Sequence, residues 1–365
     1  MSKEKANEKI DQLLAHMPSF IHEFVEIKIA DEYSPNTILE YLKNYQQFFQ
    51  WLIQHDHVPE KEMNLIEPTS LDKLQLRTAT QYKSYLLRRK KQNTRRLNQD
   101  GSKKQSSETL SKVTIQRNIT ALKVLFKYLA ESSNNIQNKP YLTHDIMREI
   151  ANVSDRRTLQ SRADTIEDKL FLGDETEKYL EYIRDIYPET LSPQAMKFYR
   201  RDSERDLAIN ALMLASGLRL SEVVSIDVNE ISFEQNRVTV IRKGNKTDSV
   251  RIAAFAMEYL ANYQAIREER YHPDKYEPAF FLSISKGKAK RITGSAIEKM
   301  VEKYSASFKV RVTPHKLRHT LATRLYQQTN NLVLTAQQLG HSSTTTTTLY
   351  THIENDKTTD ALNSL

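Results

Sequence analysis

Apolar residues in the first 130 positions recur at helical spacing, and strand patterns are nearly absent there. Ser34 can cap a helix that begins at Pro35, because serine accepts backbone hydrogen bonds and proline fits the first helical position. Three stretches then carry apolar stripes: Ile38, Tyr41, Leu42, Tyr45, Phe48, Phe49 and Leu52; Tyr82, Tyr85 and Leu86; and Ile115, Ile119, Leu122, Leu125, Phe126 and Leu129. We expect these stripes and Trp51 to form a core, and the polar residues 98–108 to form a flexible loop between helices.

The second half of the chain mixes helical and strand patterns. A helical stretch over 205–216 is followed by Gly217, which fits a left-handed helix cap. Two runs rich in β-forming residues, 237–242 and 249–253, flank a short polar segment and predict a hairpin.

Helix boundaries can also be read near the C-terminus. The Thr-Pro pair at 313–314 predicts a helix start, which places His315 and Arg318 on one helix face. A further helix ends before Gly340. The threonine run 344–348 fits a strand or loop as well as a helix.

Periodicity is lost between 131 and 165, and this loss divides the chain. We predict an N-terminal helical domain over 1–150, a linker over 151–172 and a C-terminal domain over 173–365. The 365 residues suffice for two domains with separate cores. The predicted fold class is mainly α with a small β-sheet or hairpin.

Composition excludes several kinds of chemistry. The chain has only 7 glycines, too sparse for a dinucleotide fingerprint or a phosphate P-loop, so ATP-driven chemistry is not expected. The absence of cysteine excludes disulfides, thiolate nucleophiles and Cys-based metal sites. No apolar run approaches the length of a membrane span, and the N-terminus has no clear signal region. We expect a soluble, cytoplasmic protein without a membrane partner.

Positive charge is concentrated in one segment. The chain carries 54 basic and 46 acidic residues, a net charge of +8. Nine bases and a single acid lie between positions 83 and 104, the bases being Lys83, Arg88, Arg89, Lys90, Lys91, Arg95, Arg96, Lys103 and Lys104. This cluster fits contact with nucleic-acid phosphates, and it fits a solvated helix end that continues into a loop equally well.

A set of residues in the C-terminal domain suits phosphoryl transfer without a metal or cofactor: Arg219, Lys243, His315, Arg318, His341 and Tyr350. Each alone has an ordinary explanation as a surface or turn residue. Together, the guanidiniums can bind phosphate oxygens, the imidazoles can move protons and the lysine can protonate a departing oxygen. The tyrosine can be a covalent nucleophile where neighbouring cations favour its ionised form.

Two other sites fit the sequence less well. His315 and His319 have the spacing of a zinc helix, but Lys316 stands where that motif needs a glutamate. A serine hydrolase is not favoured, because no Gly-x-Ser-x-Gly elbow occurs.

Three segments resemble the signature boxes of tyrosine site-specific recombinases, the phage integrase family. They are 215–222 (ASGLRLSE), 313–319 (TPHKLRH) and 339–352 (LGHSSTTTTTLYTH), in the order of that family and with a hairpin lysine between the first two. The resemblance covers about 170–360. A weaker one relates the helix after Ser34 to the first helix of the core-binding domain. Length and opening segment are most similar to single Xer recombinases, which act without a paired protein.

The resemblance implies a role for each residue. Tyr350 resembles the nucleophile that forms a 3′-phosphotyrosyl link with DNA. Arg219 and Arg318 resemble the phosphate-binding arginines, and Lys243 resembles the general acid for the leaving 5′-hydroxyl. The remaining implied roles are acid–base catalysis, transition-state hydrogen bonding and orientation of the site, for His315, His341 and Glu222 in that order.

The resemblance also implies architecture and partners. A SAM-like helical domain and a catalytic domain are expected to close around double-stranded DNA as a C-shaped clamp, as a homotetramer on two sites. The implied activity is resolution of chromosome dimers at a dif-like site, with a septal DNA translocase as a candidate activator. Residues after Tyr350 are expected to dock into a neighbouring subunit. The basic insertion at 88–108 departs from the common paired Xer proteins.

Three alternatives stay open at this point. A mobile-element integrase uses the same chemistry, and a type IB topoisomerase would relax DNA through the same phosphotyrosine link. A non-catalytic architectural protein would share the basic helices but would not need the ordered residue set.

Overall fold

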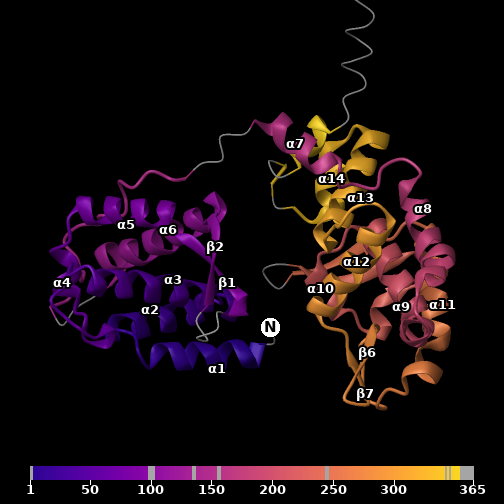
Figure 1. Ribbon diagram of the computed structural model, residues 1–365, viewed down its shortest axis with the longest axis horizontal. Coiled ribbons are helices and arrows are strands. Elements are labelled where there is room, and N and C mark those ends of the chain that lie inside the picture. The colour runs from indigo at the N-terminus through magenta and orange to yellow at the C-terminus, as the bar shows by residue number, and fades with distance from the viewer. Residues whose placement is uncertain are drawn as a thin grey trace, which may run out of the picture. The chain divides into compact units, whose positions relative to one another are not determined.

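The computed structural model describes residues 3–97, 103–133, 137–153, 158–242, 246–341, 343–344 and 347–353. The chain divides into two compact units, Met1–Arg156 and Arg157–Leu365. In Figure 1 the first unit runs from indigo to magenta and the second from magenta to yellow. Helices predominate in both, which confirms the predicted fold class.

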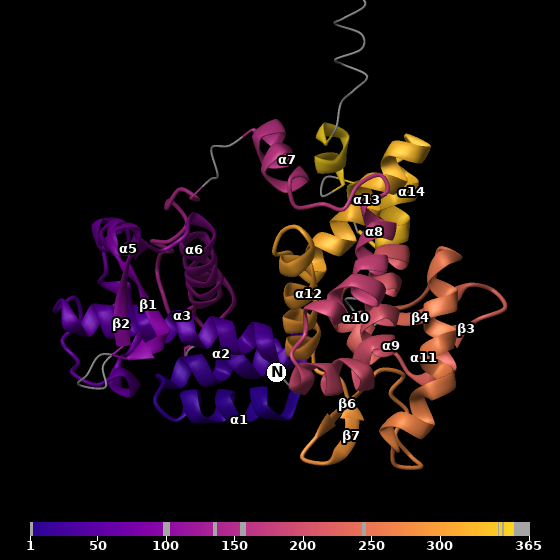
Figure 2. The same cartoon turned by 45° about the vertical axis from the view of Figure 1, so that its right-hand side comes forward.

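The first unit is built from helices and one strand pair. Its elements are α1 (Lys3–Leu14), α2 (Ser19–Ala30), α3 (Pro35–Gln54), η1 (Met63–Leu65), α4 (Pro68–Asp72), α5 (Leu76–Arg88), β1 (Lys90–Leu97), β2 (Lys103–Thr109), α6 (Lys112–Lys127) and η2 (Tyr128–Ser132). Helices α1, α2 and α3 lie side by side in both views, and α3 also contacts α6 (Figure 2).

The predicted start of α3 is confirmed. Ser34 is the N-cap, its hydroxyl accepts a hydrogen bond from the backbone N–H of Thr37 at 3.2 Å, and Pro35 is the first helical residue. The apolar stripe of α3 faces the core, where Phe48 meets the ring of Tyr82 edge-on at 4.8 Å. Trp51 is 3% exposed and packs among aromatic rings, as expected.

The expectation of a loop at 98–108 is wrong in part. β1 and β2 pair antiparallel, with Lys90 opposite Thr109 and Leu97 opposite Lys103. Residues 98–102 lie outside the described part of the chain. The sequences of both strands are almost entirely polar, so they lack the alternation of apolar and polar residues by which a strand is recognised in a sequence.

The second unit contains the remaining elements. They are α7 (Leu159–Glu167), α8 (Glu175–Glu181), η3 (Tyr182–Ile186), η4 (Tyr187–Thr190), α9 (Pro193–Ser216), α10 (Leu220–Ser225), η5 (Val228–Glu230), β3 (Ile231–Ser232), β4 (Arg237–Arg242), β5 (Lys246–Arg251), α11 (Phe255–Tyr271), β6 (Leu282–Ser285), β7 (Lys288–Arg291), α12 (Gly294–Phe308), α13 (Pro314–Thr329), α14 (Leu332–Leu339) and η7 (Thr348–His352). Helix α7 lies inside the range 151–172 that we expected to be a linker.

Helix α9 is the central element of the second unit. Ser203 and all residues from Arg205 to its end are buried, and it contacts α8, α11, α12 and α13. Strands β3, β4 and β5 form an antiparallel sheet in that order, and β6 pairs with β7. The predicted hairpin is confirmed: Arg242, the last residue of β4, lies opposite Lys246, the first residue of β5.

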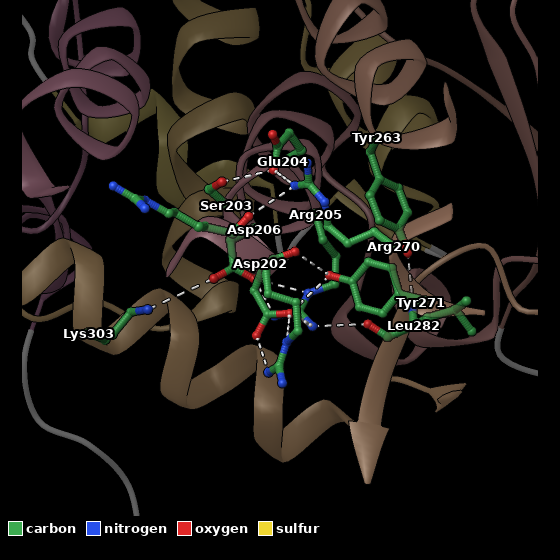
Figure 3. A network of polar contacts seen from close by, with 12 residues as sticks. Asp202, Ser203, Glu204, Arg205, Asp206, Tyr263, Arg270, Tyr271, Leu282 and Lys303 are labelled. Carbon is green, nitrogen blue, oxygen red and sulfur yellow. Dashed lines mark hydrogen bonds and ion pairs between the residues drawn. The ribbon is translucent and has the colours of Figure 1, made fainter. Parts of the chain in front are cut away.

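A buried polar network anchors the middle of α9 (Figure 3). The guanidinium of Arg205 donates to Asp206 and to the carbonyl oxygen of Leu282 in β6, at 2.6 Å and 3.0 Å. Tyr304 of α12 donates to the other oxygen of Asp206 at 2.9 Å, and Tyr271 of α11 bonds Asp202 at 3.0 Å. Because buried charges are costly unless they are paired, this network favours one arrangement of α9, α11, α12 and β6.

Candidate active site

The end of α9 begins the candidate site. Gly217 caps the helix with φ 67°, a left-handed conformation, as predicted. A Cβ at this position would lie 2.8 Å from Leu321 and 2.9 Å from Leu339, so only glycine fits. The chain then turns directly into α10, whose N-cap is Arg219.

Glu222 binds two arginines. It is 3% exposed and accepts hydrogen bonds from the backbone N–H and the guanidinium of Arg219, at 2.7 Å and 2.8 Å. Arg242 donates to the same carboxylate at 3.1 Å. A carboxylate this deeply buried is tolerated because both oxygens have cationic or N–H partners.

Arg242 is placed by the alternation of its strand. Val238, Val240 and Arg242 are the buried positions of β4, so the guanidinium points inward. It also donates to Asp248 at 3.0 Å and to the carbonyl oxygens of Leu339 and Gln338 at the end of α14. The negative end of that helix therefore adds to the attraction.

Arg318 lies on α13 and is 2% exposed. Its guanidinium donates to the carbonyl oxygens of Gly217 and Leu339, each at 2.5 Å, and thereby ties the ends of α9 and α14 together. Burial, with the nearby charge of Arg219, lowers the pKa of Arg318 to about 10. A phosphate beside this group would be strongly attracted, because the cation has no carboxylate of its own at hydrogen-bond distance in the described structure.

Gly340 lies against the arginines of this site. It caps α14 with φ 61°, as predicted, and its carbonyl oxygen accepts from Arg219 at 3.0 Å. A Cβ here would lie 2.7 Å from Cζ of Arg242. We call Arg219, Arg242 and Arg318, with Glu222, the arginine cluster.

Two predicted histidines lie beside the cluster. His315 lies on the first turn of α13, where partial desolvation of its ring by neighbouring groups and the charge of Arg318 lower its pKa. His341 follows the cap of α14 and bonds the hydroxyl of Thr347 through Nδ1 at 2.9 Å. Partial burial and the same arginine lower the pKa of His341 to about 4. Both rings are therefore neutral near pH 7, as proton acceptors must be.

Tyr350 lies in η7 and is 2% exposed. Its phenol oxygen is 2.8 Å from Nδ1 of His319, a hydrogen bond across two elements. Burial raises the pKa of Tyr350 to about 12, and the charge of Arg318 opposes that rise. The phenol is thus protonated near neutral pH.

The chain around Tyr350, residues 347–353, is here called the tyrosine segment. Leu349, Tyr350 and Ile353 pack in a small apolar cluster with Ala163 and Leu339. Helix α7 contacts the segment, and Gln160 donates to the carbonyl oxygen of His352 at 3.1 Å. The range expected to be a linker therefore supplies part of the surroundings of the tyrosine.

The structure brings together five of the six predicted residues, Arg219, His315, Arg318, His341 and Tyr350, with Glu222 among them. The sixth, Lys243, lies outside the described residues, directly after β4. Sequence reasoning missed two contributors. Arg242 was assigned only to a strand, and its position among the inward-facing residues of that strand was the available signal. His319 was considered only as a zinc ligand.

The predicted basic residues lie in the other unit, on α5 and the β1–β2 pair. Arg88 and Lys90 are exposed, while Lys83, Arg89 and Lys91 are partly buried. Lys91 is paired with Glu108 at 2.6 Å. Arg95, Arg96, Lys103 and Lys104 lie on the strands, and their side chains are outside the described part of the structure.

Among the described side chains, no three histidine or acidic groups gather as a metal site. None of the described helices contains a stretch long and apolar enough to cross a membrane.

The chain is similar to known proteins over its full length. The model of the Phage integrase family matches residues 188–357. The chain is 45% identical to Tyrosine recombinase XerS of Streptococcus pneumoniae (strain Hungary19A-6) and 44% identical to that of Streptococcus pyogenes serotype M1, over 365 residues and the full length of both chains in each case.

Two solved structures share the fold. The XerH site-specific recombinase bound to palindromic difH substrate, a post-cleavage complex, is 22% identical with a TM-score of 0.59, covering 90% of this chain and 78% of that one. A lambda integrase (75–356) dimer bound to a COC′ core site is 11% identical with a TM-score of 0.55, covering 91% and 94%.

Proposed function

The chain belongs to the tyrosine recombinases of the phage integrase family, and we propose that it resolves chromosome dimers at a dif-like site in the bacterial cytoplasm. The observation that carries the proposal is the meeting of the arginine cluster, His315 and a buried tyrosine in one site. Full-length similarity to recombinases named XerS supports the chromosomal role over that of a mobile-element integrase.

The proposed reaction starts at Tyr350. Its phenol oxygen attacks the scissile phosphorus and loses its proton, the bond from phosphorus to the 5′ oxygen breaks, and that oxygen takes a proton from Lys243. The products are a 3′-phosphotyrosyl ester and a free 5′-hydroxyl. The energy of the phosphodiester stays in the new ester, so rejoining needs neither ATP nor a metal.

The other residues stabilise charge in this scheme. Arg219 and Arg318 bind the nonbridging oxygens of the phosphate, where negative charge builds up in the transition state. His315 serves as an acid–base group and His341 donates a hydrogen bond. Glu222 orients the site by binding Arg219 and Arg242.

DNA binding is assigned to both units in this proposal. The helical domain 1–150 and the catalytic domain 173–365 would close on duplex DNA as a C-shaped clamp, and four subunits would join two sites. The bases from Lys83 to Lys104 would contact phosphates, which position a protein without reading sequence. Residues after Tyr350 would dock into the next subunit. Activation by a septal DNA translocase is part of the proposal.

Salt dependence tests the phosphate contacts. Affinity for a duplex carrying the site should fall by about 0.9 log unit per log unit of salt for each contact. Removing the charge of Arg88 should reduce that slope by about one contact. An affinity independent of salt would contradict the assignment.

The activity is tested with a nicked suicide substrate that carries the candidate chromosomal site. The expected result is a covalent complex whose DNA-linked peptide contains Tyr350. A link at another tyrosine, such as Tyr326, would overturn the assignment. Relaxation of a supercoiled plasmid with a single site, without recombination of two sites, would favour a type IB topoisomerase instead.

A further inference from the structure

The phenol of Tyr350 has one described hydrogen-bond partner, Nδ1 of His319 at 2.8 Å. The two rings also meet edge to face, with centroids 5.5 Å apart. The histidine lies on α13, one residue after Arg318 and four after His315, so a single stretch of helix carries a phosphate-binding group and the partner of the tyrosine. The role of His319 has so far been left open.

We propose that His319 is the catalytic base that removes the proton from Tyr350 when the phenol attacks DNA. This inference rests on the proposed function and names one more residue of that site. A base must reach the proton directly or through one water, and His319 is the described imidazole at that distance from the phenol.

The other basic side chains nearby are engaged elsewhere. His341 uses Nδ1 to bond Thr347, and Arg318 donates to two carbonyl oxygens. The exposed ring of His315 packs against His319 with centroids 4.4 Å apart, on the solvent side of the pair. This arrangement leaves His315 available to a phosphate and His319 to the nucleophile.

The charges around His319 explain why the pair is idle without DNA. Burial, followed by the repulsion that a protonated His319 would meet from neighbours that include the cations Lys316 and Arg318, lowers the pKa of His319 to about 3. The phenol beside it has a pKa of about 12, so transfer of the proton is strongly unfavourable. In the transition state the phosphate carries nearly two negative charges. Bound beside Arg318 and its neighbouring cations, it would offset their positive charge and so raise the pKa of His319, but only when substrate is present.

Two proton transfers accompany the proposed attack on phosphorus. The phenol proton passes to Nδ1 of His319, which becomes an imidazolium, as the bond from the phenol oxygen to phosphorus forms. The electron pair of the bond to the 5′ oxygen goes to that oxygen, which takes a proton from the general acid Lys243. In rejoining, the 5′-hydroxyl returns its proton to Lys243 as it attacks phosphorus. The bond from phosphorus to the phenol oxygen breaks, and the imidazolium returns its proton to the tyrosine.

Matched substitutions separate a base from a positioning group. The amide oxygen of His319→Asn can accept a hydrogen bond from the phenol near the place of Nδ1, but it cannot take up the proton. His319→Ala removes both functions. If His319 is the catalytic base, both variants should cleave the suicide substrate about 10²- to 10⁴-fold more slowly than the unchanged protein. A cleavage rate of His319→Asn close to that of the unchanged protein would show that His319 only positions the phenol, and would overturn the proposal.

Two modified reactants provide a readout that misfolding would not mimic. A substrate with sulfur in place of the 5′ bridging oxygen has a leaving group that needs no proton, so it should rescue Lys243→Ala and leave His319→Ala slow. A fluorinated tyrosine at position 350, whose phenol is more acidic, should rescue His319→Ala but not Lys243→Ala. Rescue of His319→Ala by the sulfur substrate would assign it to the leaving group and reject the base.

The controls keep this proposal separate from the function on which it rests. If the unchanged protein forms no adduct at Tyr350, the proposed function fails. If that adduct forms and His319→Ala makes it at the same rate, only the role of His319 fails. Thermal melting and DNA affinity of each variant show that the chain is folded and bound.

Discussion

The arginine cluster and the tyrosine segment lie side by side but are held in place differently. Each arginine of the cluster has two or more polar partners: Arg242 binds two carboxylates and two carbonyl oxygens, and Arg318 binds two carbonyl oxygens. The tyrosine segment is a short 3₁₀ turn, held by apolar contacts, by the hydrogen bonds of Tyr350 to His319 and of Thr347 to His341, and by a bond from α7.

This difference matches two requirements of the reaction. Electrostatic stabilisation works best from groups that do not reorganise, and the many bonds of the cluster keep its charges fixed. A nucleophile that is 2% exposed must shift before it can meet a phosphate, and a single 3₁₀ turn can shift at lower cost than a long packed helix. The comparison therefore predicts severe effects where the nucleophile or a phosphate-binding charge is lost, and mild effects where only the support of the tyrosine segment is weakened.

The largest effect is expected for Tyr350→Phe. Loss of the phenol oxygen should abolish the covalent adduct completely, while the ring keeps its apolar contacts and the variant still binds DNA. Adduct formation is measured on the suicide substrate by denaturing gel, with Tyr326→Phe as the control. Any adduct retained by the Tyr350 variant would remove this segment from the chemistry.

Arg318→Ala should follow, with cleavage slowed by about three orders of magnitude, because one fixed charge and its two carbonyl contacts are lost. Arg311 is a matched control, since its side chain is 68% exposed and paired with Glu302 at 2.6 Å. Single-turnover cleavage at saturating protein measures both. If Arg318→Ala binds DNA more weakly but cleaves bound DNA at the rate of the unchanged protein, the cluster has no catalytic role.

Gly340→Ala tests the fit of the cluster. The new methyl group would strike the guanidinium of Arg242, and φ of 61° is unfavourable for alanine, so unfolding free energy should fall by about 2–4 kcal/mol. Gly173→Ala is the control: φ is 55° there, but no atom lies within 4 Å of the added Cβ, so only about 1 kcal/mol is expected. Urea unfolding compares them, and equal losses would mean that the close approach to Arg242 is unimportant.

The smallest effect is expected for Gln160→Ala, which removes the bond from α7 to His352. One exposed hydrogen bond contributes about 0.5–1 kcal/mol, so the melting temperature should change little. Hydrogen exchange of residues 347–353 should nevertheless become faster. Thr165→Ala is the control, because that hydroxyl bonds within α7, to the carbonyl oxygen of Ser161. Equal exchange in both variants would show that α7 does not restrain the segment.

Local sequence rules located most elements of this protein. The caps at Ser34, Gly217 and Gly340 and the start of α13 could be predicted because each depends on a few adjacent residues. The β1–β2 pair could not, since the sequences of its strands are polar and show no alternation of apolar residues. Helix α7 was assigned to a linker because the sequence over 131–165 lacks apolar periodicity. Its position beside η7 depends on residues 192 positions apart, such as Gln160 and His352.

The sequence by itself determined the helical fold class and the ordered boxes that carry Arg219, Arg318 and Tyr350, since periodicity and spacing are properties of neighbouring residues. Only the tertiary structure decided which side chains act together. Arg242 reaches Glu222 from a different element, and His319 meets Tyr350 from another helix. Burial then lowers the pKa of His319 and raises the pKa of Tyr350, because desolvation and charge depend on what surrounds a group in space.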